Sequence, residues 1–130
     1  MKIIIYIFIS TVSFSQNCDS NNWKTYYESD GHNMKYCELS GADLSGENLS
    51  EANLEGANLS GANLSGANLK LAKLISANLS KVEFSGANIV GVNFHKANLS
   101  DVNFSGFDLR GPKNFWDVNL SNSNLENANL

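Results

Sequence analysis

The chain has 130 residues, of which 42% are hydrophobic and 17% are charged, and its formal net charge is −4. This is the length of a single domain. The apolar content excludes wholesale disorder, and the charge excludes a nucleic-acid binder built on basic patches. Asn (20 residues), Ser (17) and Leu (15) dominate against one Pro and one Arg, and such a bias indicates an internal repeat.

The first fifteen residues have the pattern of a secretory signal peptide. A positive start precedes an apolar run over 3–9, and Ser13 and Ser15 place small residues two apart before a cleavage predicted at Gln16. A buried strand is the alternative for such a β-prone run. The run is far shorter than the ~20 apolar residues of a membrane span. The sequence therefore predicts a signal peptide over 1–15, no membrane span, and a mature chain that is secreted, periplasmic or on the cell surface.

Residues 16–36 lack the repeat that follows them and are rich in aromatic side chains, such as Trp23, Tyr26 and Tyr27. The residues that follow repeat every five positions, as described below, and such repeats predict a solenoid. The first coil of a solenoid exposes an apolar end and open strand edges. We therefore interpret 16–36 as an N-terminal capping segment. An aromatic carbohydrate-binding patch is the alternative.

The chain has two cysteines, Cys18 and Cys37. A disulfide between them would tie the capping segment to the first coil and stabilise the fold by roughly 3 kcal/mol. Cys37 also occupies an inward small-residue position of the repeat, where a free thiol packs well. Lipid attachment at Cys18 is disfavoured, because Gln16 and Asn17 are poor replacements for the small residues expected before a lipidated Cys. Export favours the disulfide.

From Cys37 onward the chain repeats every five residues, beginning CELSG, ADLSG, ENLSE, ANLEG. Each unit has one large apolar residue, here called its centre, and Pro112 inserts one residue that shifts the register. There are nineteen units, with centres at Leu39, Leu44, Leu49, Leu54, Leu59, Leu64, Leu69, Leu74, Leu79, Phe84, Ile89, Phe94, Leu99, Phe104, Leu109, Phe115, Leu120, Leu125 and Leu130.

A five-residue period fits neither a helix nor a long strand. Within a unit the small residue and the centre are two apart, so in extended backbone both point inward while the intervening Asn points outward. The Ser-Gly pair that follows favours a turn. Each unit is therefore three extended residues and a corner, and successive coils stack ~4.8 Å apart through parallel hydrogen bonds.

These units resemble the pentapeptide-repeat family, whose motif is a small residue, Asn or Asp, Leu, and two polar or small residues. The resemblance covers 37–130 and implies an all-β fold, a right-handed quadrilateral parallel β-helix (solenoid). In that family four units form one square coil, so this chain would hold nearly five coils.

Four units per coil predict which side chains stack in the core. Phe84 should stack on Phe104, and Phe94 on Phe115. Glu47 sits in an inward position, where a buried lone Glu would be destabilising by several kcal/mol, so we expect it to turn outward through a local distortion.

The C-terminal part departs from the motif in two ways. Phe107, Pro112 and Lys113 mark one irregular corner, and the chain stops on the centre Leu130 without a cap. We expect that the repeat domain is incomplete at this end, or that it self-associates through the C-terminal coil.

The residues that carry chemistry are few. His95 follows a centre and is expected to be solvated, and His32 lacks the spacing of a zinc ligand. No nucleophile elbow, phosphate loop or Rossmann pattern is present. We predict no catalytic residue, metal site or cofactor, and therefore no enzyme. Seven glycosylation triplets follow from the repeat itself and are treated as coincidence: Asn48, Asn58, Asn63, Asn78, Asn98, Asn103 and Asn119.

Charge divides the repeats into an acidic beginning and a basic middle, which we interpret as solvated surface. The acidic residues are Glu38, Asp43, Glu47, Glu51 and Glu55, and the basic residues are Lys70, Lys73, Lys81 and Lys96. The sequence predicts an exported, non-catalytic scaffold or protein-interaction module with an unknown protein partner and no nucleic acid. One alternative is a DNA-mimic inhibitor of the topoisomerase gyrase, disfavoured by the basic middle and the signal peptide. Another is the repeat part of a larger enzyme or adhesin.

Overall fold

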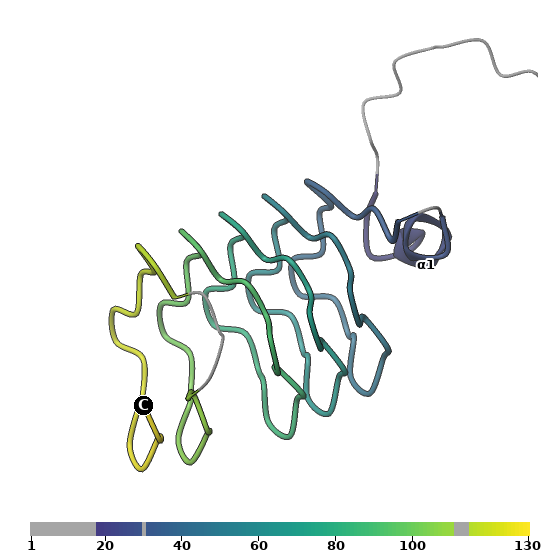
Figure 1. Ribbon diagram of the computed structural model, residues 1–130. Coiled ribbons are helices and arrows are strands. Elements are labelled where there is room, and N and C mark those ends of the chain that lie inside the picture. Colours follow the sequence, from purple (N-terminus) through teal and green to yellow (C-terminus); the bar gives the residue numbers. More distant parts are fainter. Residues whose placement is uncertain (1–17, 30, 111–114) are drawn as a thin grey trace, which may run out of the picture.

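A computed structural model describes residues 18–29, 31–110 and 115–130. Within these ranges the chain forms one short helix, α1 (Trp23–Tyr27), beside a stack of coils that runs to the C-terminus (Figure 1). The predicted signal peptide over 1–15 and the predicted insertion at Pro112 lie outside the described residues.

The coils are held together by isolated parallel bridges between residues twenty positions apart, such as Asn58 with Asn78. Because a unit has five residues, this spacing puts four units in each coil and gives the stack four sides. From Asn98 onward the bridged residues are 21 apart, as one inserted residue requires. We number the sides by their centres: side 1 holds Met34, Leu54, Leu74, Phe94 and Phe115; side 2 begins at Leu39, side 3 at Leu44 and side 4 at Leu49.

The regular coil extends one unit further toward the N-terminus than the count from Cys37. Met34 is fully buried in a centre position, and the preceding Asn33 is bridged to Asn53. The unit around Met34 has His32 in place of the small residue and Lys35 at its corner. This unit therefore lacks the repeat motif, although its apolar centre Met34 and its outward Asn33 keep the five-residue spacing of the later units.

Apolar side chains fill the interior of the coils. The leucine centres from Leu39 to Leu79 are fully buried, and most of the inward alanines beside them are too. The predicted ring stacking is confirmed: the centroids of Phe84 and Phe104 are 5.8 Å apart, and those of Phe94 and Phe115 are 5.1 Å apart. Packing of this kind leaves no space for a ligand inside these coils.

Most corners are built by an outward Asn or Asp and by a left-handed residue. In one example the backbone N–H of Ser60 donates to Oδ1 of Asn58 at 3.2 Å, and the N–H of Ala62 donates to the carbonyl of Leu59 at 2.9 Å. The second corner residue, here Gly61, has positive φ in every described unit. This conformation explains why Gly is frequent there. With two of the five residues in the corner, each side keeps a single bridged residue, so the three-residue extended segments do not form continuous strands.

Candidate functional site

The outward Asn side chains of side 2 form a hydrogen-bonded ladder along the stack. The Nδ2 of each Asn donates to the Oδ1 of the Asn one coil earlier, at 3.3 Å from Asn78 to Asn58, 3.1 Å from Asn98 to Asn78 and 2.9 Å from Asn119 to Asn98. All four residues belong to glycosylation triplets, and the ladder gives their amides a role in the fold. Side 2 is thus a flat surface whose amide groups already bond to one another.

The four corners carry very different side chains. After sides 2 and 3 nearly every described corner begins with Ser, whereas the corners on either side of side 1 carry bulky apolar residues. Four of these are exposed: Leu71 (50%), Val90 (56%), Tyr36 (62%) and Trp116 (74%). Apart from Leu130 at the C-terminal end, the large apolar side chains that are exposed in the described residues therefore lie on the two corners that flank side 1.

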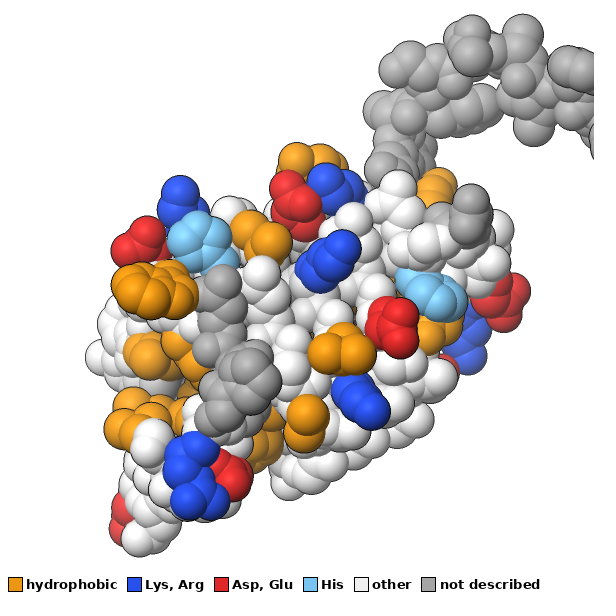
Figure 2. Space-filling model, in the orientation of Figure 1, with side chains coloured by type: hydrophobic (Ala, Val, Ile, Leu, Met, Phe, Trp, Pro, Cys, Tyr) orange, Lys and Arg blue, Asp and Glu red, His pale blue; other side chains and the backbone are white. Residues whose placement is uncertain are grey.

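Three lysines lie on the same surface in the middle coils. Lys70 and Lys73 belong to one coil and Lys96 to the next, and all three are exposed. Among the described residues none of the three forms an ion pair. We call this surface the lysine face and define it by six residues. Figure 2 shows that the charged and apolar side chains on one face of the molecule stand out among white polar ones. The lysine face consists of Lys70, Leu71, Lys73, Val90, Lys96 and Trp116.

Other basic residues near this surface are paired. Lys35 Nζ lies 2.8 Å from a carboxylate oxygen of Glu55, and this hydrogen bond raises the pKa of Lys35. Arg110 lies 3.0 Å from Asp108, which raises the pKa of the guanidinium. Within the described residues, the lysines of this surface that form no ion pair therefore lie in the middle coils.

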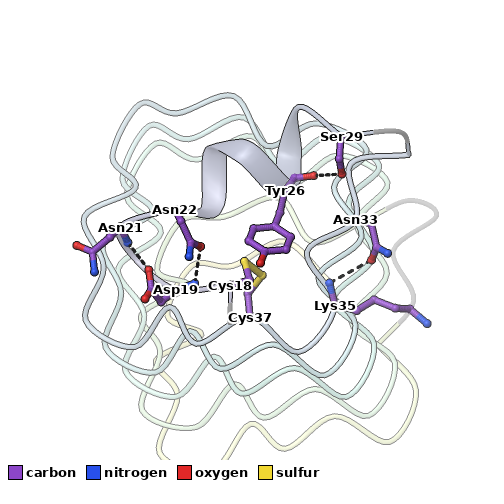
Figure 3. The surroundings of a disulfide bond; sticks show 9 residues. All are labelled: Cys18, Asp19, Asn21, Asn22, Tyr26, Ser29, Asn33, Lys35 and Cys37. Atoms are coloured by element: carbon purple, nitrogen blue, oxygen red, sulfur yellow. Dashed lines mark hydrogen bonds between the residues drawn. A yellow bond between two sulfur atoms is a disulfide. The ribbon is translucent and has the colours of Figure 1, made fainter. Parts of the chain in front are cut away.

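The N-terminal segment is fixed to the first coil by the cysteines and by α1. The structure has a disulfide between Cys18 and Cys37, whose Cα atoms are 4.7 Å apart, and the ring of Tyr26 lies beside it (Figure 3). The Tyr27 hydroxyl donates to the carbonyl of Ser50 at 3.1 Å, and Trp23 is buried. These contacts seat α1 against the open end of the first coil.

Glu47 turns away from the core, but the expected local distortion is wrong. Its N–H still donates to the carbonyl of Leu44 at 3.2 Å, and its carbonyl still accepts from Asn68 at 2.9 Å. The side chain reaches Lys24 of α1 instead, at 2.9 Å. Glu47 is tolerated because it lies on the first coil, where α1 supplies a cation and water remains accessible.

Two hollows open on the described surface. One, of about 220 Å³, lies between α1 and the first coil and is lined by Trp23, Tyr27 and the Lys24–Glu47 pair among others. The second, of about 190 Å³, is apolar and lies at the C-terminal end, lined by Leu109, Phe115, Leu120, Leu125 and Leu130. Both are smaller than the ~300 Å³ at which ordinary ligand pockets begin.

The two histidines are not brought together. His32 stacks on Tyr27 at 4.4 Å, and its Nδ1 lies 2.6 Å from the Tyr27 carbonyl oxygen. His95 Nδ1 lies 3.2 Å from the carbonyl oxygen of Trp116, on another coil. Within the described ranges no cluster of His, Cys, Asp and Glu is suited to hold a metal ion. In the same ranges, no helix is long and apolar enough to cross a bilayer.

The described residues form a coil with four units per turn and a filled interior. This architecture is that of a β-helix repeat protein. The model of pentapeptide repeats matches eight copies over 37–74 and 67–106, more than half of the chain. The chain belongs to the pentapeptide repeat family. No curated protein matches the sequence.

Among the solved structures to which this chain is similar, one agrees with this fold over most of its length. A pentapeptide repeat protein from the thylakoid lumen of Arabidopsis thaliana is 28% identical over 76% of this chain and 69% of its own, with a TM-score of 0.70. Rfr23, a pentapeptide repeat protein from the cyanobacterium Cyanothece 51142, is 34% identical over 75% and 63%, with a TM-score of 0.37. QnrB1, a plasmid-mediated fluoroquinolone resistance protein, is 24% identical over 69% and 53%, with a TM-score of 0.38. This chain is accordingly a right-handed β-helix, and proteins of its family are generally non-catalytic.

Proposed function

We propose that this chain is an exported, non-catalytic scaffold or protein-interaction module. The observation that carries the proposal is the contrast between a filled interior and a varied surface. The centres and small inward residues leave no internal cavity in the coils from Leu39 to Phe104. Many amides of the flat sides bond to one another, and the side chains vary most at the corners. A rigid rod with variable corners is suited to present side chains to another protein.

Finer features of the fold belong to the same proposal. The nineteen five-residue units over 37–130, together with the unit around Met34, would build about five square coils, with the residues before that unit as the cap of the first coil. The contacts of α1 with Ser50 and Glu47 support the capping role, because they cover an end that would otherwise expose open strand edges.

Export is supported by the pattern of the first fifteen residues and by the lumenal relative from Arabidopsis thaliana. Expression in a secreting host, followed by mass spectrometry of the exported protein, should give a mature chain that begins at Gln16. The variant Ile5→Asp should block export, because it interrupts the apolar run. A conservative control, Ile5→Leu, should be exported normally. Intact protein that keeps Met1 and stays in the cytoplasm contradicts this part of the proposal.

The interaction function is tested by cross-linking in the exporting host. We expect the folded chain to be joined reproducibly to one protein partner through residues of its corners, and a chain unfolded by reduction and denaturant to lose that partner. The absence of any reproducible cross-linked protein contradicts the interaction function. Inhibition of gyrase supercoiling by the mature chain would favour the DNA-mimic alternative. The exposed lysines disfavour that alternative, since mimicry of DNA needs dense negative charge along the rod.

Self-association through the C-terminal coil is a second candidate, favoured by the apolar hollow at that end. Leu130 is 78% exposed there and borders Leu109 and Leu125. Sedimentation equilibrium should show dimers for the mature chain and monomers for Leu130→Glu, because a buried carboxylate without a partner is strongly unfavourable. Monomers for both chains contradict this candidate.

A further inference from the structure

We propose that the lysine face binds an acidic segment of another protein that also carries apolar side chains. This inference rests on the proposed interaction function and names its surface and the chemistry of its partner. The face is created by the fold, because the four-unit coil places residues 70–76 beside residues 90–96 on the next coil. At the strand spacing of ~4.8 Å, the side chains of these two stretches lie on the same surface of neighbouring coils.

The apolar part of the face lies flat along the rod. A side chain added at Gly91 would meet the Cδ2 atom of Leu71 at 2.7 Å, so Leu71 lies over the backbone of the next coil. Val90 precedes this glycine and is itself 56% exposed. Leu71 and Val90 therefore form one apolar strip across two coils. Such a strip gains stability when a partner covers it.

The positive charge of the lysine face favours a negatively charged partner. The stretches 70–76 and 90–96 hold three lysines and no carboxylate, whereas the whole chain has a net charge of −4. On the neighbouring coils Glu55 is paired with Lys35, whereas Glu51 and Asp117 form no ion pair with a described residue. A partner carboxylate is therefore attracted to the three lysines of the middle coils and repelled by Glu51 and Asp117.

The same balance favours a protein over a polyanion. Three lysines offer few phosphate contacts, and the net charge of −4 disfavours a duplex or an anionic membrane that extends beyond them. The apolar strip and the largely exposed Trp116 have no use in binding phosphates, but they match Leu, Val or Phe side chains of a protein segment. A short segment with both carboxylate and apolar side chains uses every part of the face.

The test is fluorescence anisotropy with the full mature chain and a dye-labelled synthetic peptide of Glu, Leu and Ser, at low ionic strength. One matched peptide has Lys in place of Glu, and another has Ser in place of Leu. We expect the first peptide to bind with a Kd below about 1 mM, and each matched peptide to bind at least about tenfold more weakly. The absence of binding at that concentration overturns the proposal. Tighter binding of duplex DNA or of vesicles containing phosphatidylserine also overturns it.

Two lysines in the same backbone setting give a matched pair of variants. Lys96 and Lys81 are both exposed second corner residues, with φ of 58° and 60°, but Lys81 lies at the corner after side 2. We expect Lys96→Glu to weaken peptide binding about fivefold and Lys81→Glu to weaken it less than about twofold. Leu71→Asn, which keeps a residue that tolerates positive φ, should weaken binding at least about threefold. Equal effects of the two lysine variants overturn the proposal.

The lysine face and the interaction function can fail separately. Cross-links to a partner through the corner after side 2 or side 3, without peptide binding, overturn the lysine face and leave the interaction function in place. Peptide binding that Lys96→Glu weakens as expected, together with a lack of partner in the exporting host, supports the face and contradicts the interaction function.

Discussion

Asn78 shows how one residue type supports both the corner and the stacking of coils. Its Oδ1 accepts from the N–H of Ser80 at 3.2 Å and from Nδ2 of Asn98 at 3.1 Å, and its own Nδ2 donates to Asn58 at 3.3 Å. We expect Asn78→Ala to lower the free energy of unfolding by about 2 kcal/mol, since each net hydrogen bond contributes ~0.5–1.5 kcal/mol. Urea denaturation followed by circular dichroism measures the change.

Asn103 is the control for this prediction. Among the described residues it makes the corner bond to Ser105, at 2.9 Å, but no ladder bond. Asn103→Ala should therefore have a clearly smaller effect than Asn78→Ala. Equal effects would show that the ladder bonds contribute little.

Asp43 replaces the usual outward Asn and makes one corner sensitive to pH. The side-chain hydroxyl and the backbone N–H of Ser45 donate to its carboxylate and lower the pKa of Asp43. A lowered folded-state pKa means that the contribution to stability is present above the unfolded-state pKa of about 3.9 and is lost as pH falls through the folded-state value. Titration followed by NMR should show the depressed pKa of the Asp43 carboxyl. Asp43→Asn should keep the corner and remove this part of the pH dependence, and an unchanged acid sensitivity would contradict the assignment.

At the scale of elements, the disulfide joins the N-terminal segment to the first coil across a sequence separation of 19 residues. Cys37→Ala with Cys18→Ser keeps a small inward side chain in the first coil, because Ala occupies this position in most units. We expect the double variant to lose about 3 kcal/mol of stability. Chemical denaturation measures the loss, and reduction of the unmodified chain should reproduce it. Two free thiols in the intact mass of the native exported protein would contradict the bond.

The residues of the core could be predicted from the sequence, because the five-residue period alone identifies which side chains point inward. The stacking of Phe84 on Phe104 followed from the count. The unit of Met34 lies in the same phase as the others, but its surroundings lack the motif, so spacing alone was the available signal. The partner of Glu47 could not be predicted, because the position of α1 over the first coil depends on tertiary contacts and not on any period.

At the scale of the whole molecule, the lysine face was hidden in the sequence for a similar reason. The basic middle was visible, but Lys73 and Lys96 become neighbours only when residues twenty positions apart are bridged. The apolar corner residues are scattered along the sequence as exceptions to the Ser-Gly pair. The coil gathers them into one surface, so the repeat determines the fold and the exceptions to the repeat determine the candidate site.

The twenty-residue period also predicts which deletions the rod tolerates. Removal of residues 57–76 takes out one full coil, so every remaining side chain keeps its side of the stack. Nearest-neighbour stacking implies that the shortened rod folds cooperatively, with a lower free energy of unfolding because one interface between coils is lost.

A deletion two residues longer, over 56–77, is the control. It breaks the five-residue phase, so inward and outward positions no longer agree across the junction and outward Asn side chains enter the core, where unsatisfied amides are strongly unfavourable. We expect this variant to show a broad transition or none in urea, while the first keeps a single sharp one. Equal, cooperative unfolding of both chains would mean that residues five apart do not share an environment, and the square coil would then be the wrong description of this protein.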